Sequence, residues 1–417
     1  MVLALTYSDV FNSYVIWLMM PYLTNVWKLN DAHAAAIINV WRGLMWMMPI
    51  CMLYSADTVM GKFPMIVLSG VTSSIGFGLL SMSTPRVFTK EIGTCYSYEP
   101  KCISGEKISF FFAALLLTAL GISGLRSSLP PLLEKNLEDT KKEEEISEGK
   151  AMRLLSSLSY INPWSIKFGV PAICTAAATV VFISGSCYYS REPPAGSPFT
   201  TVFRVICAAT SKIFLDKAAT FLPNQSQEQQ KRNRWRLCRV TEVEETKLVV
   251  RLFHRCPFFI ICGLVSAAGH RFFMSQANHL KRNNYPLLIL PFFFDISKNY
   301  SHLISCGVLS KYQPRIGIGI SMILDAICCM TAATVEAWRL NVVKSHGLLY
   351  KPDDEIPMFF SVLVPQFVLL GVNDGIFEQC VSGFFKNQVP PTMRPYLKWL
   401  SEGIRGVGII GGGGWKD

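Results

Sequence analysis

Long apolar stretches, separated by shorter segments that hold most of the charges, dominate the pattern of this chain of 417 residues. A helix needs roughly 20 mainly apolar residues to cross the hydrocarbon core of a bilayer. The stretches that approach or exceed this length are 3–26, 34–55, 63–83, 108–130, 169–189, 253–275, 284–308, 315–337 and 357–384. The pattern therefore predicts an all-α membrane protein whose spanning helices pack into a bundle.

The largest interruption of the apolar pattern is the segment 190–252, in which nine lysines and arginines lie between residues 191 and 239. Within it, residues 240–252 alternate Glu and Lys with Val and Leu at helical spacing, which predicts an amphipathic helix. This segment is predicted to be a cytoplasmic hydrophilic loop between two groups of spans. The expected organisation is an N-terminal helix bundle at 1–189, the loop at 190–252 and a C-terminal helix bundle at 253–417.

The composition supports a membrane protein, because 50% of the residues are hydrophobic and only 17% are charged. In a soluble domain, about a quarter of the residues are charged. The net charge of +11 is typical of a Lys and Arg excess in cytoplasmic loops. No aromatic–basic RNA motif or zinc-finger spacing appears, so nucleic acid is not a predicted partner. The 13 cysteines include no CxxC pair, and we predict no metal, no cofactor and no enzymatic activity.

One formal motif match is Gly406-Val-Gly408-Ile-Ile-Gly411, which fits the GxGxxG pattern of dinucleotide-binding loops. No strand precedes it and no βαβ unit surrounds it, so a dinucleotide site is not predicted. Close packing of helices through small residues, or a flexible end, explains these glycines better.

Several short blocks carry a more specific signal. The segment Ala56-Asp57-Thr-Val-Met-Gly61-Lys62-Phe63 leads from one apolar stretch into the next, and Trp235-Arg-Leu-Cys-Arg-Val-Thr-Glu-Val-Glu-Glu245 lies in the central loop. Both resemble the proton-dependent oligopeptide transporter family, in particular its plant nitrate/peptide transporter branch, whose loop signature includes Asp57 and Gly61. Further blocks follow the family's order at 119–126, 168–174, 214–219, 313–319 and 384–390.

The resemblance implies a major-facilitator-type bundle, here with about ten spans and with three departures from the family pattern. The family's Glu-x-x-Glu-Arg motif on the first helix, which couples transport to protons, is reduced to Asp9. The fifth helix is left with 149–161, which as a helix covers roughly 20 Å of a core of about 30 Å. The eleventh helix runs into the glycines 411–414 and a twelfth is missing. We therefore expect a shortened member of the family.

Charged residues inside spans are the candidate functional groups, because burying a charge in a membrane is costly. Arg126 on the fourth helix and Asp374 on the tenth stand where the family has a Lys and a Glu. The resemblance implies that these groups face each other across a central cavity and that their pairing changes as the transporter switches access. The alternative is a static salt bridge between the two bundles.

Other titratable side chains lie nearby in the sequence. Glu378 is one helical turn from Asp374 and on the same face, so it is a candidate proton acceptor or, near the helix end, a solvated group. His270 in the seventh span could titrate near neutral pH or have a structural role. Asp295 and Lys298, three residues apart on a helix, are expected to satisfy each other.

The leading hypothesis is a multi-pass secondary transporter of nitrate, a di- or tripeptide or a related small anionic or zwitterionic compound, with protons as symported partner where coupling is retained. Its partners would be the lipid bilayer and this solute, and it would be located in the plasma membrane or the vacuolar membrane. The rival hypothesis is a non-transporting, degenerate or regulatory membrane protein of the same fold. The missing first-helix motif favours the rival, and the family blocks favour the transporter.

Overall fold

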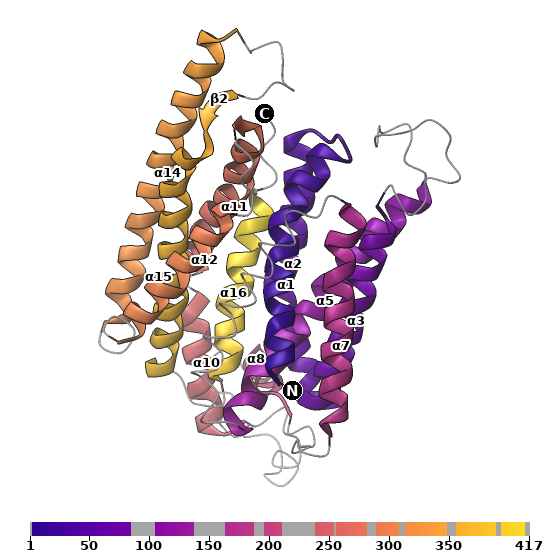
Figure 1. Cartoon of the computed structure of the whole chain (residues 1–417). Coiled ribbons are helices and arrows are strands. Elements are labelled where there is room, and N and C mark those ends of the chain that lie inside the picture. The colour runs from indigo at the N-terminus through magenta and orange to yellow at the C-terminus, as the bar shows by residue number, and fades with distance from the viewer. Residues whose placement is uncertain are drawn as a thin grey trace, which may run out of the picture.

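The computed structural model describes residues 2–84, 105–136, 163–186, 196–210, 238–253, 256–281, 289–307, 313–347, 356–388 and 393–412. Nearly all of these residues are helical, and the long helices run side by side (Figure 1). The helices before the central loop are α1 Val2–Asn25, α2 Asp31–Ser55, α3 Lys62–Met82, α5 Gly105–Asn136 and α7 Trp164–Ser184, with a π-helical turn η1 Ala56–Met60 after α2. Two short helices follow, α8 Pro198–Thr210 and α10 Val240–Phe253.

The rest of the described chain forms α11 Cys256–His279, α12 Ile289–Gly307, α14 Pro314–Ser345, α15 Val364–Gln388 and α16 Arg394–Gly411. A two-residue strand, β1 Leu280–Lys281, pairs in parallel with β2 Ile356–Phe359, and a 3-10 turn, η5 Phe360–Leu363, leads into α15. The all-helical membrane fold predicted from the hydropathy pattern is confirmed, and six helices of the described chain are long and apolar enough to cross a membrane. The start of the last predicted span is a strand and a 3-10 turn instead of α-helix, and the shortened fifth helix expected at 149–161 lies outside the described residues.

The helices pack in three main groups. α3 packs against α5 and α7, and α5 also contacts α2. On the other side of the molecule, α15 packs against α12 and α14 (Figure 1). α16 packs against both α2 and α11, so it joins the helices that precede the central loop to those that follow it.

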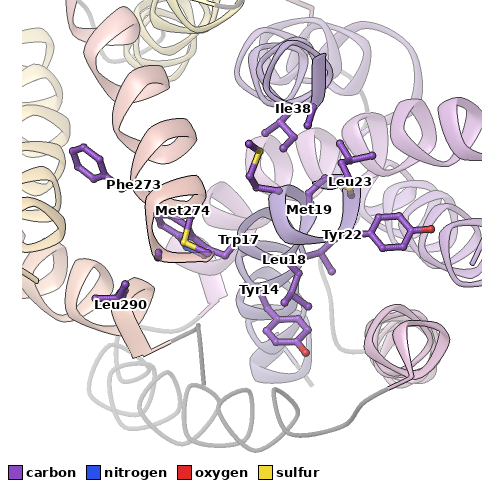
Figure 2. Close-up of a cluster of buried hydrophobic side chains, with 14 of the residues drawn as sticks. Tyr14, Trp17, Leu18, Met19, Tyr22, Leu23, Ile38, Phe273, Met274 and Leu290 are labelled. Carbon is purple, nitrogen blue, oxygen red and sulfur yellow. The ribbon is translucent and has the colours of Figure 1, made fainter. Parts of the chain in front are cut away.

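α1 is enclosed by its neighbours, which matches a helix that is apolar all round. Trp17 contacts Phe294 of α12, with ring centroids 5.3 Å apart, and Tyr22 contacts Phe168 of α7 at 5.0 Å. Figure 2 shows Trp17 beside Met274 of α11, while Tyr22 points to another side of α1. α1 therefore forms the centre of the main hydrophobic core and contacts helices from both halves of the chain.

Glycines allow α16 to approach its two neighbours closely. A Cβ atom built on Gly406 would lie 2.8 Å from the backbone oxygen of Gly43 on α2, and one on Gly408 would collide with the backbone of Ile260 on α11. The interpretation of the GxGxxG match as a close-packing motif is thus confirmed. The carbonyl oxygens of neighbouring helices occupy the space that larger side chains would need.

The central segment contains the amphipathic helix predicted at 240–252, observed as α10. α10 packs against α8, and Arg204 Nη2 lies 2.7 Å from Glu242 Oε1. Val202 and Val249 share a hydrophobic cluster with Phe259 of α11, so both short helices pack on the helices that follow the loop. α8, α10 and the N-terminus lie at the same end of the molecule, which we call the near end (Figure 1).

Candidate functional site

The structure brings charged side chains from α2, α5, α15 and α16 together halfway along the bundle. Asp374 of α15 forms an ion pair with Arg405 of α16, and their side chains are 7% and 3% exposed. The guanidinium carbon of Arg405 lies 5.6 Å from the ring centre of Trp46 on α2. Arg126 of α5 contacts the same ring, also at 5.6 Å. Trp46 therefore joins Arg126 and Arg405. We call Arg42, Trp46, Arg126, Asp374 and Arg405 the central cluster.

Arg42 of α2 is the least satisfied member of the central cluster. Its side chain is buried, and within the described chain no hydrogen-bond acceptor reaches its Nη1 atom. It interacts electrostatically with Asp374, Arg405 and Arg126. One helical turn earlier, the amide of Asn39 is also buried with no hydrogen-bond partner in the same part of the structure. A buried polar group without a partner needs an explanation, such as a functional role or a bound water or ion.

The two residues predicted to form a gating pair both belong to the central cluster. In this structure the ion pair of Asp374 is with Arg405, and Arg126 stacks on Trp46. Direct pairing of Arg126 with Asp374 during a change of access therefore stays a prediction. Sequence reasoning did not single out Arg405, although it is a charged residue on a helix with an apolar face.

Glu378 forms an ion pair that the sequence did not predict. Its Oε2 atom lies 3.1 Å from Nζ of Lys298 on α12, and its side chain is 27% exposed. Lys298 is thus paired with a residue of α15. The predicted contact between Lys298 and Asp295 stays a prediction. A further carboxylate, that of Glu402 on α16, is buried, and its Oε2 atom has no hydrogen-bond partner among the described residues. Glu402 interacts electrostatically with Glu378 and was not singled out from the sequence.

The residues of the family loop signature have structural roles at the near end. Gly61 has φ 86°, a conformation that glycine adopts without strain, and its amide donates to the Ala56 carbonyl at 2.8 Å. The Asp57 carboxylate accepts a hydrogen bond from the Tyr396 hydroxyl of α16. This near-end contact connects the α2–α3 turn with the start of α16. His270 lies in α11, and its side chain is outside the described residues.

A second set of polar contacts lies at the opposite end, which we call the far end. Asn25 at the end of α1 and Asn278 of α11 exchange two amide hydrogen bonds of 3.1 and 2.9 Å. Ser275 of α11 donates to the carboxylate of Asp31 at the start of α2. These four residues form the far-end network, which joins the two halves of the chain.

Gln276, which follows Ser275 on α11, makes further polar contacts next to the far-end network. Gln276 donates to Glu336 of α14 at 2.6 Å, and Glu336 also accepts two hydrogen bonds from Arg339 at 2.6 and 2.8 Å. Among the described residues, no group of three or more His, Cys, Asp or Glu side chains could hold a metal ion.

A bundle of membrane-spanning helices, with a buried charged cluster inside it and polar contacts at both ends, is the arrangement expected of a membrane transporter of the major-facilitator type. The sequence model described as PTR2, POT family, matches residues 150–401. The chain belongs to this family.

Individual relatives and solved structures agree with that assignment. Protein NRT1/PTR FAMILY 5.5 of Arabidopsis thaliana is 33% identical to the chain, over 95% of this chain and 84% of the relative. Protein NRT1/PTR FAMILY 5.4 of the same plant is 25% identical, over 94% and 80%. The crystal structure of an auto-inhibited POT family peptide transporter matches with a TM-score of 0.68 at 16% identity, over 99% of this chain and 87% of that one. The predicted family and fold are confirmed, and the protein is an integral membrane transporter, not an enzyme.

Proposed function

We propose that this transporter carries a small polar solute by alternating access, with the helices of 1–189 and those of 253–417 acting as two bundles. The observation that carries the proposal is the composition of the central cluster. Arg42, Trp46 and Arg126 come from the first set of helices, whereas Asp374 and Arg405 come from the second. A solute bound there would contact both bundles and could respond to their relative movement.

The contacts at the two ends support the same cycle. The far-end network ties α1 and α2 to α11, and the near-end contact between Asp57 and Tyr396 ties the α2–α3 turn to α16. Breaking one set while keeping the other would open the central cluster to one side only. A change of partner by Asp374, from Arg405 to Arg126, would accompany this movement.

The proposed solute is nitrate, a di- or tripeptide or a related small anionic or zwitterionic compound. The family name of the Arabidopsis relatives and the peptide transporter among the structural matches support this range. Proton coupling is expected to be weak, because the first-helix motif is reduced to Asp9. Glu378, paired with Lys298, and His270 are the proposed proton-linked groups.

Uptake by this chain in oocytes, with nitrate or a dipeptide at acidic and neutral external pH, tests the proposal. We expect measurable uptake with little stimulation by acid. Strong acid stimulation would show that proton coupling does not need the missing motif, and a Glu378→Gln variant would then test its role. Absence of any uptake from a chain present at the cell surface would favour the non-transporting alternative.

The orientation proposed for the chain places the loop 190–252 in the cytoplasm of a plasma-membrane or vacuolar-membrane transporter. The position of α8 and α10 at the same end as the N-terminus supports this (Figure 1). The sequon Asn224-Gln-Ser226 reports on it, because it is glycosylated only in the ER lumen. A gel shift removed both by an endoglycosidase and by Asn224→Gln would place the loop on the other side.

A further inference from the structure

Arg42 presents a physical problem that the transporter fold alone does not explain. Its side chain is on the middle turns of α2, only 4% exposed, and its Nη1 atom has no hydrogen-bond acceptor in the described chain. An ionised group in such a place is costly unless a charge or hydrogen bonds compensate it. A guanidinium presents its donors as a planar fork, which matches the oxygens of a carboxylate or a similar planar anion.

The charges around Arg42 do not cancel. Three charges act on Arg42, of which Arg405 and Arg126 are positive and Asp374 is negative. Asp374 is already committed to Arg405. Arg42 is thus left without a carboxylate of its own among the described residues.

Arg42 also borders an internal space. A cavity of about 10 Å³, close to the size needed for one water molecule, lies between α1, α2 and α11. Its walls include Ile16, Trp17 and Met20 of α1 and Met274 of α11, and Arg42 is the one charged side chain among the described residues that line it. A group entering this space would meet apolar surface on most sides and the guanidinium on one.

We propose that Arg42 is the anchoring residue of an anion-binding site, which takes a single planar monovalent anionic group: nitrate, or the carboxylate of a small organic solute. The inference rests on the proposed function and specifies the chemistry of its solute. The anion accepts hydrogen bonds from Arg42 and supplies the negative charge that Arg42 lacks. Because the bare cavity is close to the size of one water, binding requires the surrounding helices to move apart, as a change of access would require.

Binding is tested separately from transport with the purified full chain in nanodiscs. Sodium nitrate and sodium acetate are titrated while thermal unfolding is followed, with sodium chloride at matched ionic strength and acetamide as a neutral analogue of acetate. We expect stabilisation by nitrate or acetate, or by both, and none by acetamide. Nitrate alone would identify an inorganic anion site, and acetate alone a carboxylate site.

Two variants locate the site. Arg42→Gln is expected to weaken binding at least about tenfold, because a hydrogen bond to a charged group is lost, whereas Arg42→Lys keeps the charge and retains part of the affinity. Arg315→Gln, which removes an exposed charge at the start of α14, serves as the matched control and leaves binding unchanged. Asp374→Asn removes a competing carboxylate and is expected to increase the stabilisation by the anion, an effect opposite in sign.

The outcomes separate the two proposals. The inference is overturned if nitrate or acetate still stabilises the Arg42→Gln variant. It is also overturned if neither anion stabilises the unmodified chain while that chain still takes up a zwitterionic dipeptide. In the second case the transport function stands. Stabilisation that is lost in Arg42→Gln, together with no uptake of any solute, supports the anion site and contradicts the transport proposal. If Arg42→Gln does not yield folded protein, weaker anion binding in Arg42→Lys and stronger binding in Asp374→Asn support the site, and unchanged binding in both overturns it.

Discussion

The central cluster and the far-end network both join the two halves of the chain, but their polar groups are satisfied to very different degrees. At the far end, Asn25 and Asn278 exchange hydrogen bonds in both directions. In the middle of the bundle, Arg42 has a buried donor atom without an acceptor among the described residues, and Asn39 has no partner for either amide atom there. Reciprocal contacts of the first kind hold helices together, whereas unsatisfied groups of the second kind keep bonding capacity for a ligand.

The helix pair α2 and α16 is closely packed and also contributes charged residues to the central cluster. α16 lies against α2 through Gly43 and Gly406, whose backbones are in close contact. The same approach places Arg405 over Trp46 and next to Asp374. The packing of small residues therefore positions the charged groups, and the charged groups provide the chemistry.

The largest effect is expected from Arg405→Ala, which leaves the buried carboxylate of Asp374 without its partner. Breaking a buried ion pair by removing one member costs about 3–5 kcal/mol. Unfolding of the purified protein, followed by heat and by denaturant, measures the loss. In the double variant Arg405→Ala/Asp374→Ala, much of the stability should return, since neither member of the ion pair is left buried without the other. Equal losses in the single and double variants would mean that the pair does not act as a unit.

The near-end contact offers a smaller effect. Tyr396→Phe removes the hydroxyl that donates to Asp57, and a hydrogen bond to a charged group contributes about 1.5–3 kcal/mol. Tyr300→Phe, at a position that is 68% exposed on α12, is the control and should have almost no effect. Hydrogen exchange of the peptides around Asp57 and at the start of α16 should rise in Tyr396→Phe only. Unchanged exchange in that variant would show that the contact does not hold the near end closed.

The close packing of α16 is tested by Gly408→Ala. The added methyl group would collide with the backbone of Ile260 on α11, and such overpacking costs about 1–3 kcal/mol. Gly78→Ala on α3 is the matched control, because its Cβ would meet open space and alanine favours the helix. The thermal unfolding temperature should therefore fall in the first variant and stay or rise in the second. A stable Gly408→Ala would mean that α16 can shift without cost.

Much of this architecture was predictable from the sequence, because membrane crossing imposes length and hydropathy on each helix. The helices around α3 and α5 were found this way. α16 was not among the spans predicted from hydropathy, since Lys398, Glu402 and Arg405 interrupt its apolar pattern within 18 residues. It was expected only from the family resemblance, as the eleventh helix that runs into the glycines 411–414. The burial of Glu402 and Arg405 depends on the helices that enclose α16, which hydropathy does not reveal.

The candidate site shows a similar division. Arg126 and Asp374 were singled out as charges inside spans, and both belong to the central cluster. Arg42 lies inside the predicted span 34–55, so the same criterion could have found it. The pairing of Asp374 with Arg405, and of Glu378 with Lys298, could not be predicted, because it is set by the distances between helices far apart in the sequence.

The smallest effect is expected at the far end, where the contrast with the central cluster is sharpest. Asn278→Ala removes the two amide hydrogen bonds to Asn25. Each is partly exposed and contributes about 0.5–1.5 kcal/mol at most, so the fold should persist while the far end opens more often. Hydrogen exchange at the end of α11 should therefore increase several-fold, and by much more than in the peptides around Arg42. Asn341→Ala, an exposed amide on α14, is the matched control. If Asn278→Ala instead lowered global stability as much as Arg405→Ala, the far-end network would be part of the core of the fold, and its role as a separable closure would be wrong.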